Sequence, residues 1–338
     1  MDTPGQDILE VNKLHTNFLG RHGIVKAVNG VSFSLKAGEV LAIVGESGSG
    51  KSVTCLSVMR LHQPHTSRIT GEIYLDGENI MDKTERQMQK IRGNRISMIF
   101  QEPMTSLNPV YTIGRQLMEP LRMHRKLSRR KAYEESLEIL KQVGIYPPKQ
   151  RMAEYPHQLS GGMRQRIMIA MSLCCNPEVL IADEPTTALD VTIQAQIMDL
   201  MRQLTDQFNT AIILITHDLG LARELAQRVL VMYNGVVVEE GELKKMFSDP
   251  LHPYTEGLLN SIPRLDQKKK RLSIIPGNVP GPFVELKGCR FHPRCRYCQH
   301  LCRESEPELI EIAEDRRAAC HFPLGQGGIN TAEKGVKR

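Results

Sequence analysis

Continuous apolar runs recur along the chain and predict strands that are buried on both faces. The runs cover Val40–Val44, residues 179–182 and Ala211–Thr216, and helical patterns such as residues 53–61 lie between them. Strands that alternate with helices and carry apolar side chains on both faces are typical of a mostly parallel sheet. The pattern therefore predicts an α/β core.

Other stretches show the alternating pattern of half-buried antiparallel strands. Residues 8–18 and 31–35 alternate apolar and polar side chains, and residues 71–77 indicate a further strand that ends in a turn. Near the other end of the core, Asn234 and Gly235 separate two apolar runs, which is a strong hairpin signal. We expect a small antiparallel β-subdomain early in the chain and a hairpin at Asn234-Gly235.

A helical block interrupts the α/β alternation. After a strand that ends at Gln101, a turn-rich stretch leads into residues 113–143, whose pattern is helical until Gly144 and a pair of prolines close it. We interpret this block as an inserted helical subdomain at about residues 102–175.

Charge and composition narrow the function classes. The chain has 338 residues, with 44 Lys and Arg against 38 Asp and Glu, and the net charge of +6 is too mild and too dispersed to require nucleic acid. No apolar stretch approaches the length of a spanning helix, and residues 1–7 lack the features of a signal peptide. We expect a cytosolic protein whose membrane role, if it has one, needs other chains.

One glycine-rich stretch lies between the first buried strand and a helical pattern. A strand, a glycine-rich turn and a helix start form the context of a phosphate-binding loop, whose backbone N–H groups point at phosphate oxygens. Lys51 would reach the β- and γ-phosphates, and the Ser52 hydroxyl would bind Mg²⁺. The alternative, a chance glycine-rich loop, is disfavoured by this context. The stretch consists of Gly45, Glu46, Ser47, Gly48, Ser49, Gly50, Lys51 and Ser52.

Two carboxylates follow the second buried strand. In a protein with a phosphate loop, Asp183 at the strand end would hold Mg²⁺, and Glu184 could deprotonate the water that attacks the γ-phosphate. The alternative is a strand edge with solvated acids. His217 directly follows the third buried strand, at the end of a parallel strand where open α/β sheets bind ligands, although a structural histidine has the same position.

A second helix start and one aromatic residue are further candidates. Leu159, Ser160, Gly161 and Gly162 open a long apolar helix, with Ser160 as the expected N-cap, and such a helix start can bind an anion. Phe18 either packs in the core or stacks on adenine, and the sequence leaves both roles open.

The cysteines divide into two groups. Cys55, Cys174 and Cys175 lie in apolar helical stretches and are expected to be reduced core residues. The others fall close together near the C-terminus, and in a cytosolic chain this density favours a metal site over disulfides. Spacing alone favours zinc, because Cys295-x2-Cys298 is typical of a zinc half-site, and an iron–sulfur cluster is the alternative. The group contains Cys289, Cys295, Cys298, Cys302 and Cys320, with His292, His300 and His321 as alternative ligands.

With these motifs in order, residues 8–250 resemble an ATP-binding-cassette (ABC) ATPase. The phosphate loop, Gln101, the Leu-Ser-Gly-Gly signature, Asp183-Glu184, Ala188-Leu189-Asp190 and His217 match the motifs of that family. The resemblance implies a RecA-like core with an antiparallel β-subdomain and a helical subdomain that carries the signature.

The resemblance also implies roles for the matching residues. Two cassettes close head to tail over two ATP molecules, so that Ser160, Gly161 and Gly162 of one face the phosphate loop of the other. Gln101 senses Mg²⁺ and the attacking water, and its loop couples to the transmembrane partners. His217 contacts the γ-phosphate, Asp190 reports across the dimer interface, and Phe18 takes the adenine-stacking position.

Three stretches look like the peptide branch of bacterial ABC importers, most of all its dipeptide-type subunit. They lie around Gln101, around the signature and at His252-Pro253-Tyr254-Thr255. That implies an ATPase on the cytoplasmic face of the membrane, with a paralogous second ATPase subunit, two transmembrane permease subunits and an external peptide-binding protein. A soluble ABC ATPase that acts on nucleic acid or the ribosome is the alternative. We expect the nucleotide-binding domain over residues 1–262.

The remaining residues, 263–338, form the predicted Cys-rich C-terminal extension. Peptide-importer ATPases carry a similar cysteine pattern, which resembles a [4Fe–4S] cluster site. That resemblance points to Cys289, Cys295, Cys302 and Cys320 as ligands and leaves Cys298 as an extra thiol. A cluster is therefore our prediction, with zinc or an empty site as the alternatives.

Overall fold

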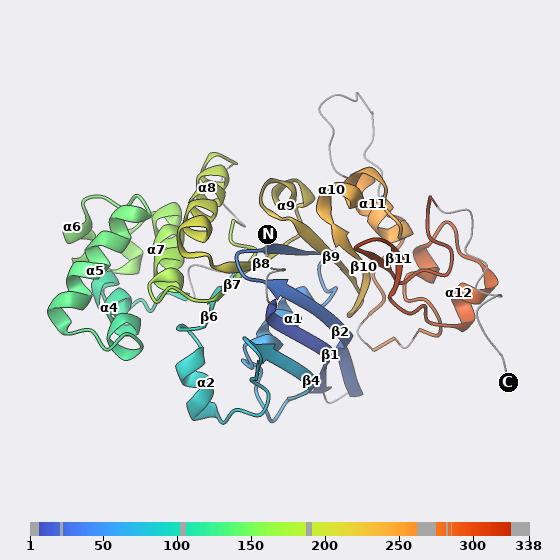
Figure 1. Cartoon of the computed structure of the whole chain (residues 1–338), viewed down its shortest axis with the longest axis horizontal. Helices are drawn as coiled ribbons and strands as arrows, with labels where there is room; N and C mark the ends of the chain where they lie inside the picture. The colour runs from blue at the N-terminus through green and yellow to red at the C-terminus, as the bar shows by residue number, and fades with distance from the viewer. Residues whose placement is uncertain are drawn as a thin grey trace, which may run out of the picture. The chain divides into compact units, whose positions relative to one another are not determined.

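The computed structural model describes residues 7–20, 23–101, 106–186, 191–261, 275–281, 283–284 and 286–325 (Figure 1). The chain divides into two compact units, each built from several segments. The first unit consists of Met1–Glu10, Ser34–Val40 and Ile73–Ile215, and the second of Val11–Phe33, Leu41–Glu72 and Thr216–Arg338. The predicted domain boundary at residues 262 and 263 lies outside the described residues and stays a prediction.

Parallel strands form the centre of the first unit. β6 (Ile96–Ile99) pairs with β7 (Val179–Asp183), and β7 pairs with β8 (Ala211–Thr216), all in parallel. Every residue of these strands is buried, as their continuous apolar sequences predicted. Helix α8 (Val191–Phe208) connects β7 to β8, so the expected α/β alternation is confirmed here.

Four helices form a group of their own in the first unit, shown in green in Figure 1. Thr112, Ser128 and Ser160 cap three of them through their side-chain oxygens. The predicted helical run from residue 113 therefore splits into two helices, because Ser128 starts a new one. Pro148 begins a helix instead of closing the block, since proline suits the first helical turn. The helices are α4 (Ile113–Met123), α5 (Arg129–Gln142), α6 (Pro148–Ala153) and α7 (Gly161–Leu173).

The sheet of the second unit begins with β3 (Val40–Val44), which lies parallel to β9 (Arg228–Tyr233). β9 turns through Asn234 and Gly235, both at positive φ, into the antiparallel β10 (Val236–Glu242), so the predicted hairpin is confirmed. β12 (Arg316–Ala318) then pairs with β10, and β11 (Ile310–Ala313) pairs with β12. The cysteine-bearing segment thus adds strands to this sheet.

The other strands and helices complete the fold. β1 (Asp7–Gly20), β2 (Gly23–Lys36) and β4 (Ser67–Leu75) are neighbours in the order β2-β1-β4, which confirms the early β-rich segment. The remaining elements are α1 (Lys51–Val58), β5 (Glu78–Asn79), α2 (Glu85–Ile91), η1 (Pro156–Gln158), α9 (Leu219–Leu225), α10 (Leu243–Ser248), α11 (Pro253–Ser261), η2 (His292–Arg294) and α12 (His300–Glu304). None of the helices in the described ranges is long and apolar enough to cross a membrane.

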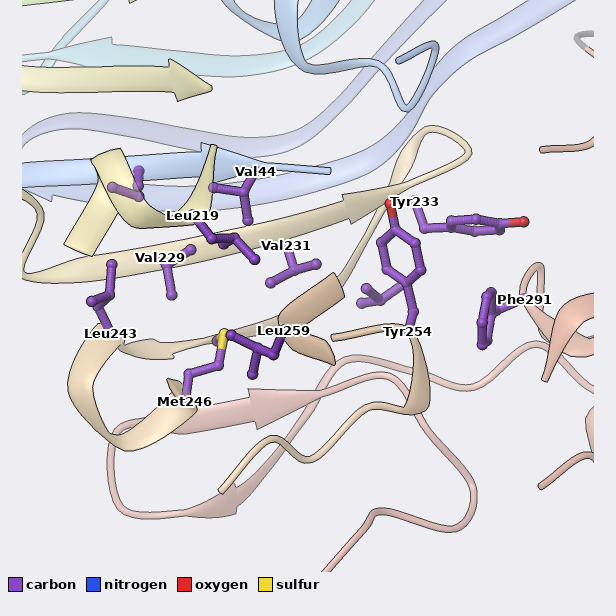
Figure 2. Packing of buried hydrophobic residues seen from close by; sticks show 13 residues of the cluster. Val44, Leu219, Val229, Val231, Tyr233, Leu243, Met246, Tyr254, Leu259 and Phe291 are labelled. Carbon is purple, nitrogen blue, oxygen red and sulfur yellow. The ribbon is translucent and has the colours of Figure 1, made fainter. Parts of the chain in front are cut away.

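A buried hydrophobic cluster joins the strands of the second unit to the cysteine-bearing segment. Figure 2 shows Val44 and Val231 of the sheet in the same cluster as Tyr233, Tyr254 and Phe291. The ring centroid of Tyr233 lies 4.7 Å from that of Tyr254 and 5.2 Å from that of Phe291. Edge-to-face aromatic contacts of this kind add to the stabilisation from burial, so this end of the segment packs firmly on the strands.

Candidate functional site

The phosphate loop connects β3 to α1 as the sequence predicted. Gly45 has a φ of 153°, and a Cβ there would lie 2.3 Å from the carbonyl oxygen of Met232. Gly50 has a φ of 102°, and a Cβ there would lie 2.7 Å from the carbonyl oxygen of Ala27. Only glycine fits both positions, because a side chain would collide with neighbouring backbone. The loop is therefore held close to the strands around it.

The side chains of the loop suit an anionic ligand. Lys51 is buried, and its Nζ donates hydrogen bonds to the carbonyl oxygens of Gly45 at 2.8 Å and Glu46 at 3.0 Å. The hydroxyl of Ser49 is buried and has no hydrogen-bond partner among the described residues. Since a buried hydroxyl without a partner is costly, the loop offers a donor to an incoming acceptor such as a phosphate oxygen. Ser52 lies in the first turn of α1, whose N-terminus also favours negative charge.

Asp183 and Glu184 lie at the carboxyl end of β7, and Gln101 follows the end of the neighbouring strand β6. Asp183 is buried, while the Oε2 of Glu184 accepts a hydrogen bond of 3.0 Å from the Nε2 of Gln101. Glu184 has a φ of 46°, which is uncommon outside glycine, and its N–H donates to the carbonyl oxygen of Ile215 at 3.0 Å. The structure thus brings together two residues predicted to act on the attacking water.

The Leu-Ser-Gly-Gly signature opens α7, and Ser160 is its N-cap as predicted. The Oγ of Ser160 accepts a hydrogen bond of 3.3 Å from the N–H of Met163. Ser160 and Gly161 are exposed at this helix start, and Gly162 is half-buried. The anion-binding role of the signature stays a prediction.

Sequence reasoning missed one contact in this unit. The buried Gln165 of α7 donates a hydrogen bond to the carbonyl oxygen of Pro185, directly after Glu184. It therefore ties the signature helix to the strand end that carries the acidic pair. Gln165 lies between Arg164 and Arg166 in the polar first half of α7, so no local signal in the sequence marked it as a buried contact.

The remaining predicted residues are placed as follows. His217 is exposed directly after β8, at the strand end predicted for a ligand contact. Phe18 of β1 is half-buried, with its ring edge-on to His62 at 5.1 Å between centroids. Its stacking on adenine and the γ-phosphate contact of His217 stay predictions. Asp190 lies outside the described residues.

The cysteine-bearing segment brings four thiols to one small pocket. Cys289, Cys295, Cys302 and Cys320 line the pocket with His292 and His321, and neither Cys298 nor His300 is among its lining residues. Burial raises the pKa of the Cys289 thiol to about 11 and that of Cys320 to about 12. Among the described residues, no three His, Cys, Asp or Glu side chains lie close enough together to hold a metal ion. Sequence spacing alone had favoured Cys295 and Cys298 as a zinc half-site, but only Cys295 of these two residues lines the pocket.

The other group of cysteines matches its predicted role. Cys55 lies in α1, and Cys174 and Cys175 form the turn that follows α7; all three are buried core residues. The Sγ atoms of Cys174 and Cys175 lie 3.9 Å apart, and contact with Cys175 and burial raise the pKa of Cys174.

Two protein-family models match the chain. The model described as "ABC transporter" matches residues 28–187, and the model described as "Oligopeptide/dipeptide transporter, C-terminal region" matches residues 238–302. The first match includes the phosphate loop, Gln101, the signature and the acidic pair, while the second includes the cysteines up to Cys302.

Similar proteins cover nearly the whole chain. The oligopeptide transport ATP-binding protein AppD of Bacillus subtilis is 52% identical over 95% of this chain and 98% of its own length. The dipeptide transport ATP-binding protein DppD of Escherichia coli is 46% identical over 96% of this chain and 99% of its own length. These matches support the transporter prediction over the alternative of a nucleic-acid or ribosome-directed ATPase.

Solved structures agree with the expected fold. An ATP-binding cassette in a dimeric post-hydrolysis state, bound to ADP and Pi, has a TM-score of 0.62 and 30% identity, and the match covers 70% of this chain and 98% of that one. The predicted α/β cassette fold is confirmed by this likeness. The chain belongs to the ABC transporter family, as an ATP-binding protein of its oligopeptide and dipeptide branch.

Proposed function

We propose that this protein binds and hydrolyses ATP to power the import of peptides across the cytoplasmic membrane. One observation carries the proposal: a glycine-rich loop with a buried Lys51 occurs in the same chain as the C-terminal region of oligopeptide and dipeptide transporters. The loop would contact the phosphates of ATP, and the family indicates that hydrolysis drives the transport of peptides.

In this proposal, the residues of the two motifs divide the work of phosphoryl transfer. Lys51 neutralises charge on the β- and γ-phosphates, and Ser52 and Asp183 would hold Mg²⁺, which when bound offsets the remaining phosphate charge. Glu184 accepts a proton from the attacking water at its carboxylate. Gln101 keeps that carboxylate in place through the hydrogen bond of 3.0 Å and would contact the Mg²⁺ and the water when they are bound.

Two cassettes complete each site in the proposed assembly. Ser160, Gly161 and Gly162 of one cassette donate to the γ-phosphate held by the other, His217 contacts the same phosphate, and Asp190 reports across the interface. The reason is electrostatic, because one cassette alone supplies only half of the donors that the developing charge requires. Phe18 stacks on the adenine in this arrangement.

We further propose that the partner cassette is a paralogous ATPase subunit and that two transmembrane permease subunits and an external peptide-binding protein complete the importer. The protein then works on the cytoplasmic face of the membrane, with residues 1–262 as the nucleotide-binding domain and residues 263–338 as the Cys-rich extension. The names of the relatives support a transport assembly, and in the described part of this chain no helix could span the membrane.

Capture of the assembled complex tests this function. A tagged Glu184→Gln protein, kept with ATP, is expected to stay in the closed dimer and to co-purify two polytopic membrane proteins and a second cassette protein from solubilised membranes. The Lys51→Ala protein is the matched control and is expected to recover less of the second cassette. Recovery of ribosomes or DNA without any membrane protein would refute the importer.

We also propose that Cys289, Cys295, Cys302 and Cys320 hold a [4Fe–4S] cluster, with Zn²⁺ as the alternative. Their common pocket supports the set, since four thiols are the donors that such a cluster uses. Among the described residues, no three His, Cys, Asp or Glu side chains are grouped closely enough to hold a metal ion, so the proposal rests on the shared pocket and on the donor type alone.

Iron analysis tests the cluster. Protein purified without oxygen is expected to contain about four iron and four sulfide per chain and to absorb visible light. Cys302→Ser is expected to lose most of the iron, whereas Cys298→Ser, the matched control three residues from Cys295, retains it. Zinc in place of iron, with no visible absorption, would reject the cluster.

A further inference from the structure

The second residue of the phosphate loop forms an ion pair with the cysteine-bearing segment. The Nη1 of Arg294 donates to the Oε2 of Glu46 at 2.6 Å, and its Nη2 donates to the Oε1 at 3.0 Å. The side chain of Arg294 is only 4% exposed, and that of Glu46 is 30% exposed. Two parallel charge-assisted hydrogen bonds fix both distance and orientation, so this contact constrains the loop more than a single bond would.

Arg294 is itself held from several sides. Its Nε donates to the carbonyl oxygen of Pro276 at 2.9 Å, its Nη1 also lies 3.4 Å from the hydroxyl of Tyr233, and its guanidinium lies 5.8 Å from the centroid of the Tyr233 ring. The residue directly precedes Cys295, one of the four thiols on the pocket. An arginine with this many fixed partners acts as a rigid support for the carboxylate that it binds.

A second contact from the same unit reaches the backbone of Glu46. Its N–H donates to the hydroxyl of Tyr254 at 2.8 Å, and Figure 2 shows that Tyr254 lies among Tyr233 and Phe291 in the buried cluster. The Nδ1 of His252 accepts a hydrogen bond of 3.0 Å from the N–H of Tyr254, and burial lowers the pKa of His252 to about 3, so the ring stays neutral and can accept. The anchor of Glu46 is therefore stiff at both its side chain and its backbone.

The carbonyl group of Glu46 connects this anchor to the lysine of the loop. Its oxygen accepts hydrogen bonds from the Nζ of Lys51 at 3.0 Å and from the N–H of Ser49 at 3.2 Å. The orientation of this one residue thus helps to set the positions of the ammonium group and of the N–H donors around it. A change in the carboxylate contact of Glu46 is transmitted to the groups that face the phosphates.

We propose that Arg294 is a positioning residue for the phosphate loop, through which the cysteine-bearing segment holds the loop in the conformation that binds ATP. The inference rests on the proposed function, because it names a further determinant of the same nucleotide site. Arg294 does not touch the nucleotide in this proposal and acts only through Glu46. A purely structural ion pair would change the stability of the protein but not its affinity for ATP.

ATP titrations of the full-length chain test the proposal. Arg294→Met is expected to raise the Kd for ATP about tenfold, because the loss of both charge-assisted bonds releases the carboxylate of Glu46 and shifts the groups that face the phosphates. Arg294→Lys keeps the charge but loses the paired geometry, so it is expected to recover part of the affinity. In the assembled transporter, the KM for ATP is expected to rise while kcat changes less than about twofold.

A double-mutant cycle and a neighbouring arginine complete the design. Glu46→Gln is expected to weaken ATP binding by a similar factor, and the double variant by no more than either single one, because both remove the same contact. Arg296→Met is the matched control, since Arg296 pairs with Glu256 and Tyr297 and its side chain is 63% exposed. Its Kd for ATP is expected to equal that of the unmodified protein.

Three results would overturn the inference: an unchanged Kd in Arg294→Met with only a lower unfolding temperature, additive effects in the cycle, or an equal loss in Arg296→Met. If Arg294→Met does not fold, Glu46→Gln carries the test alone, because it removes the charged, two-bond pair but leaves the buried arginine one neutral oxygen acceptor. Failure of the unmodified protein to bind ATP would refute the proposed function instead, so the two failures are distinguishable.

Discussion

Replacement of Lys51 by alanine is expected to weaken ATP binding by about a hundredfold or more and to abolish hydrolysis at ordinary ATP concentrations. The ammonium group is expected to exchange its two bonds to loop carbonyls, at 2.8 and 3.0 Å, for contacts with phosphate oxygens. Each such charge-assisted bond is worth about 1.5–3 kcal/mol, so the loss of two gives the expected factor.

Nucleotide titration and thermal unfolding together check this result. Without ATP, the Lys51→Ala protein is expected to unfold near the unfolding temperature of the unmodified protein. When ATP is added, its unfolding temperature is expected to stay the same, because a ligand stabilises only the protein that binds it. The matched control is Lys83→Ala, which removes a lysine that pairs with Glu78 outside the loop. Its unfolding temperature is expected to rise when ATP is added, as it does for the unmodified protein. Equal ATP affinity in the Lys51→Ala and unmodified proteins would show that this loop is not the phosphate site.

Replacement of Glu184 by glutamine is expected to leave ATP binding nearly unchanged and to lower kcat about a hundredfold to ten-thousandfold. The amide has almost the same shape as the carboxylate but cannot accept a proton, and loss of a general base typically costs that factor. Its side-chain oxygen can still accept the hydrogen bond from Gln101, now 3.0 Å long, so the local geometry is preserved.

Single-turnover hydrolysis in the assembled transporter measures the effect, with ATP binding measured in parallel. Glu178→Gln is the matched control, because Glu178 precedes β7 at the opposite end and forms an ion pair with Arg95. That variant is expected to lose some stability and to keep its rate. A near-normal rate in Glu184→Gln would mean that another group activates the water.

Local sequence predicted the buried strands, the glycine-rich loop between β3 and α1 and the cap at Ser160 correctly, because interactions between residues close in sequence decide them. Continuous apolar runs are stable only when both faces are buried, Asn234-Gly235 adopts the positive φ values that a tight hairpin needs, and Ser160 caps α7 with its own side chain. The helical block was predicted as one run, since periodicity over 113–143 is continuous and only the cap at Ser128 separates two helices.

The cysteine segment illustrates the limit of spacing as a guide. Cys295 and Cys298 are close in sequence, and a zinc half-site followed from that distance alone. In the structure, the pocket is lined instead by Cys289, Cys295, Cys302 and Cys320. The fold of the backbone, including the hydrogen bond from the N–H of Cys289 to the carbonyl oxygen of Cys302 at 2.8 Å, decides which thiols meet.

The sequence by itself determined the family, the α/β core and the glycine-rich loop between β3 and α1, because those depend on residue types at fixed short spacings. Only the tertiary structure decided that Gln101 forms a hydrogen bond with Glu184, 83 residues away, and that Arg294 forms an ion pair with Glu46, 248 residues away. No local pattern encodes such pairs, since they form only when distant segments are brought together by the burial of apolar side chains elsewhere.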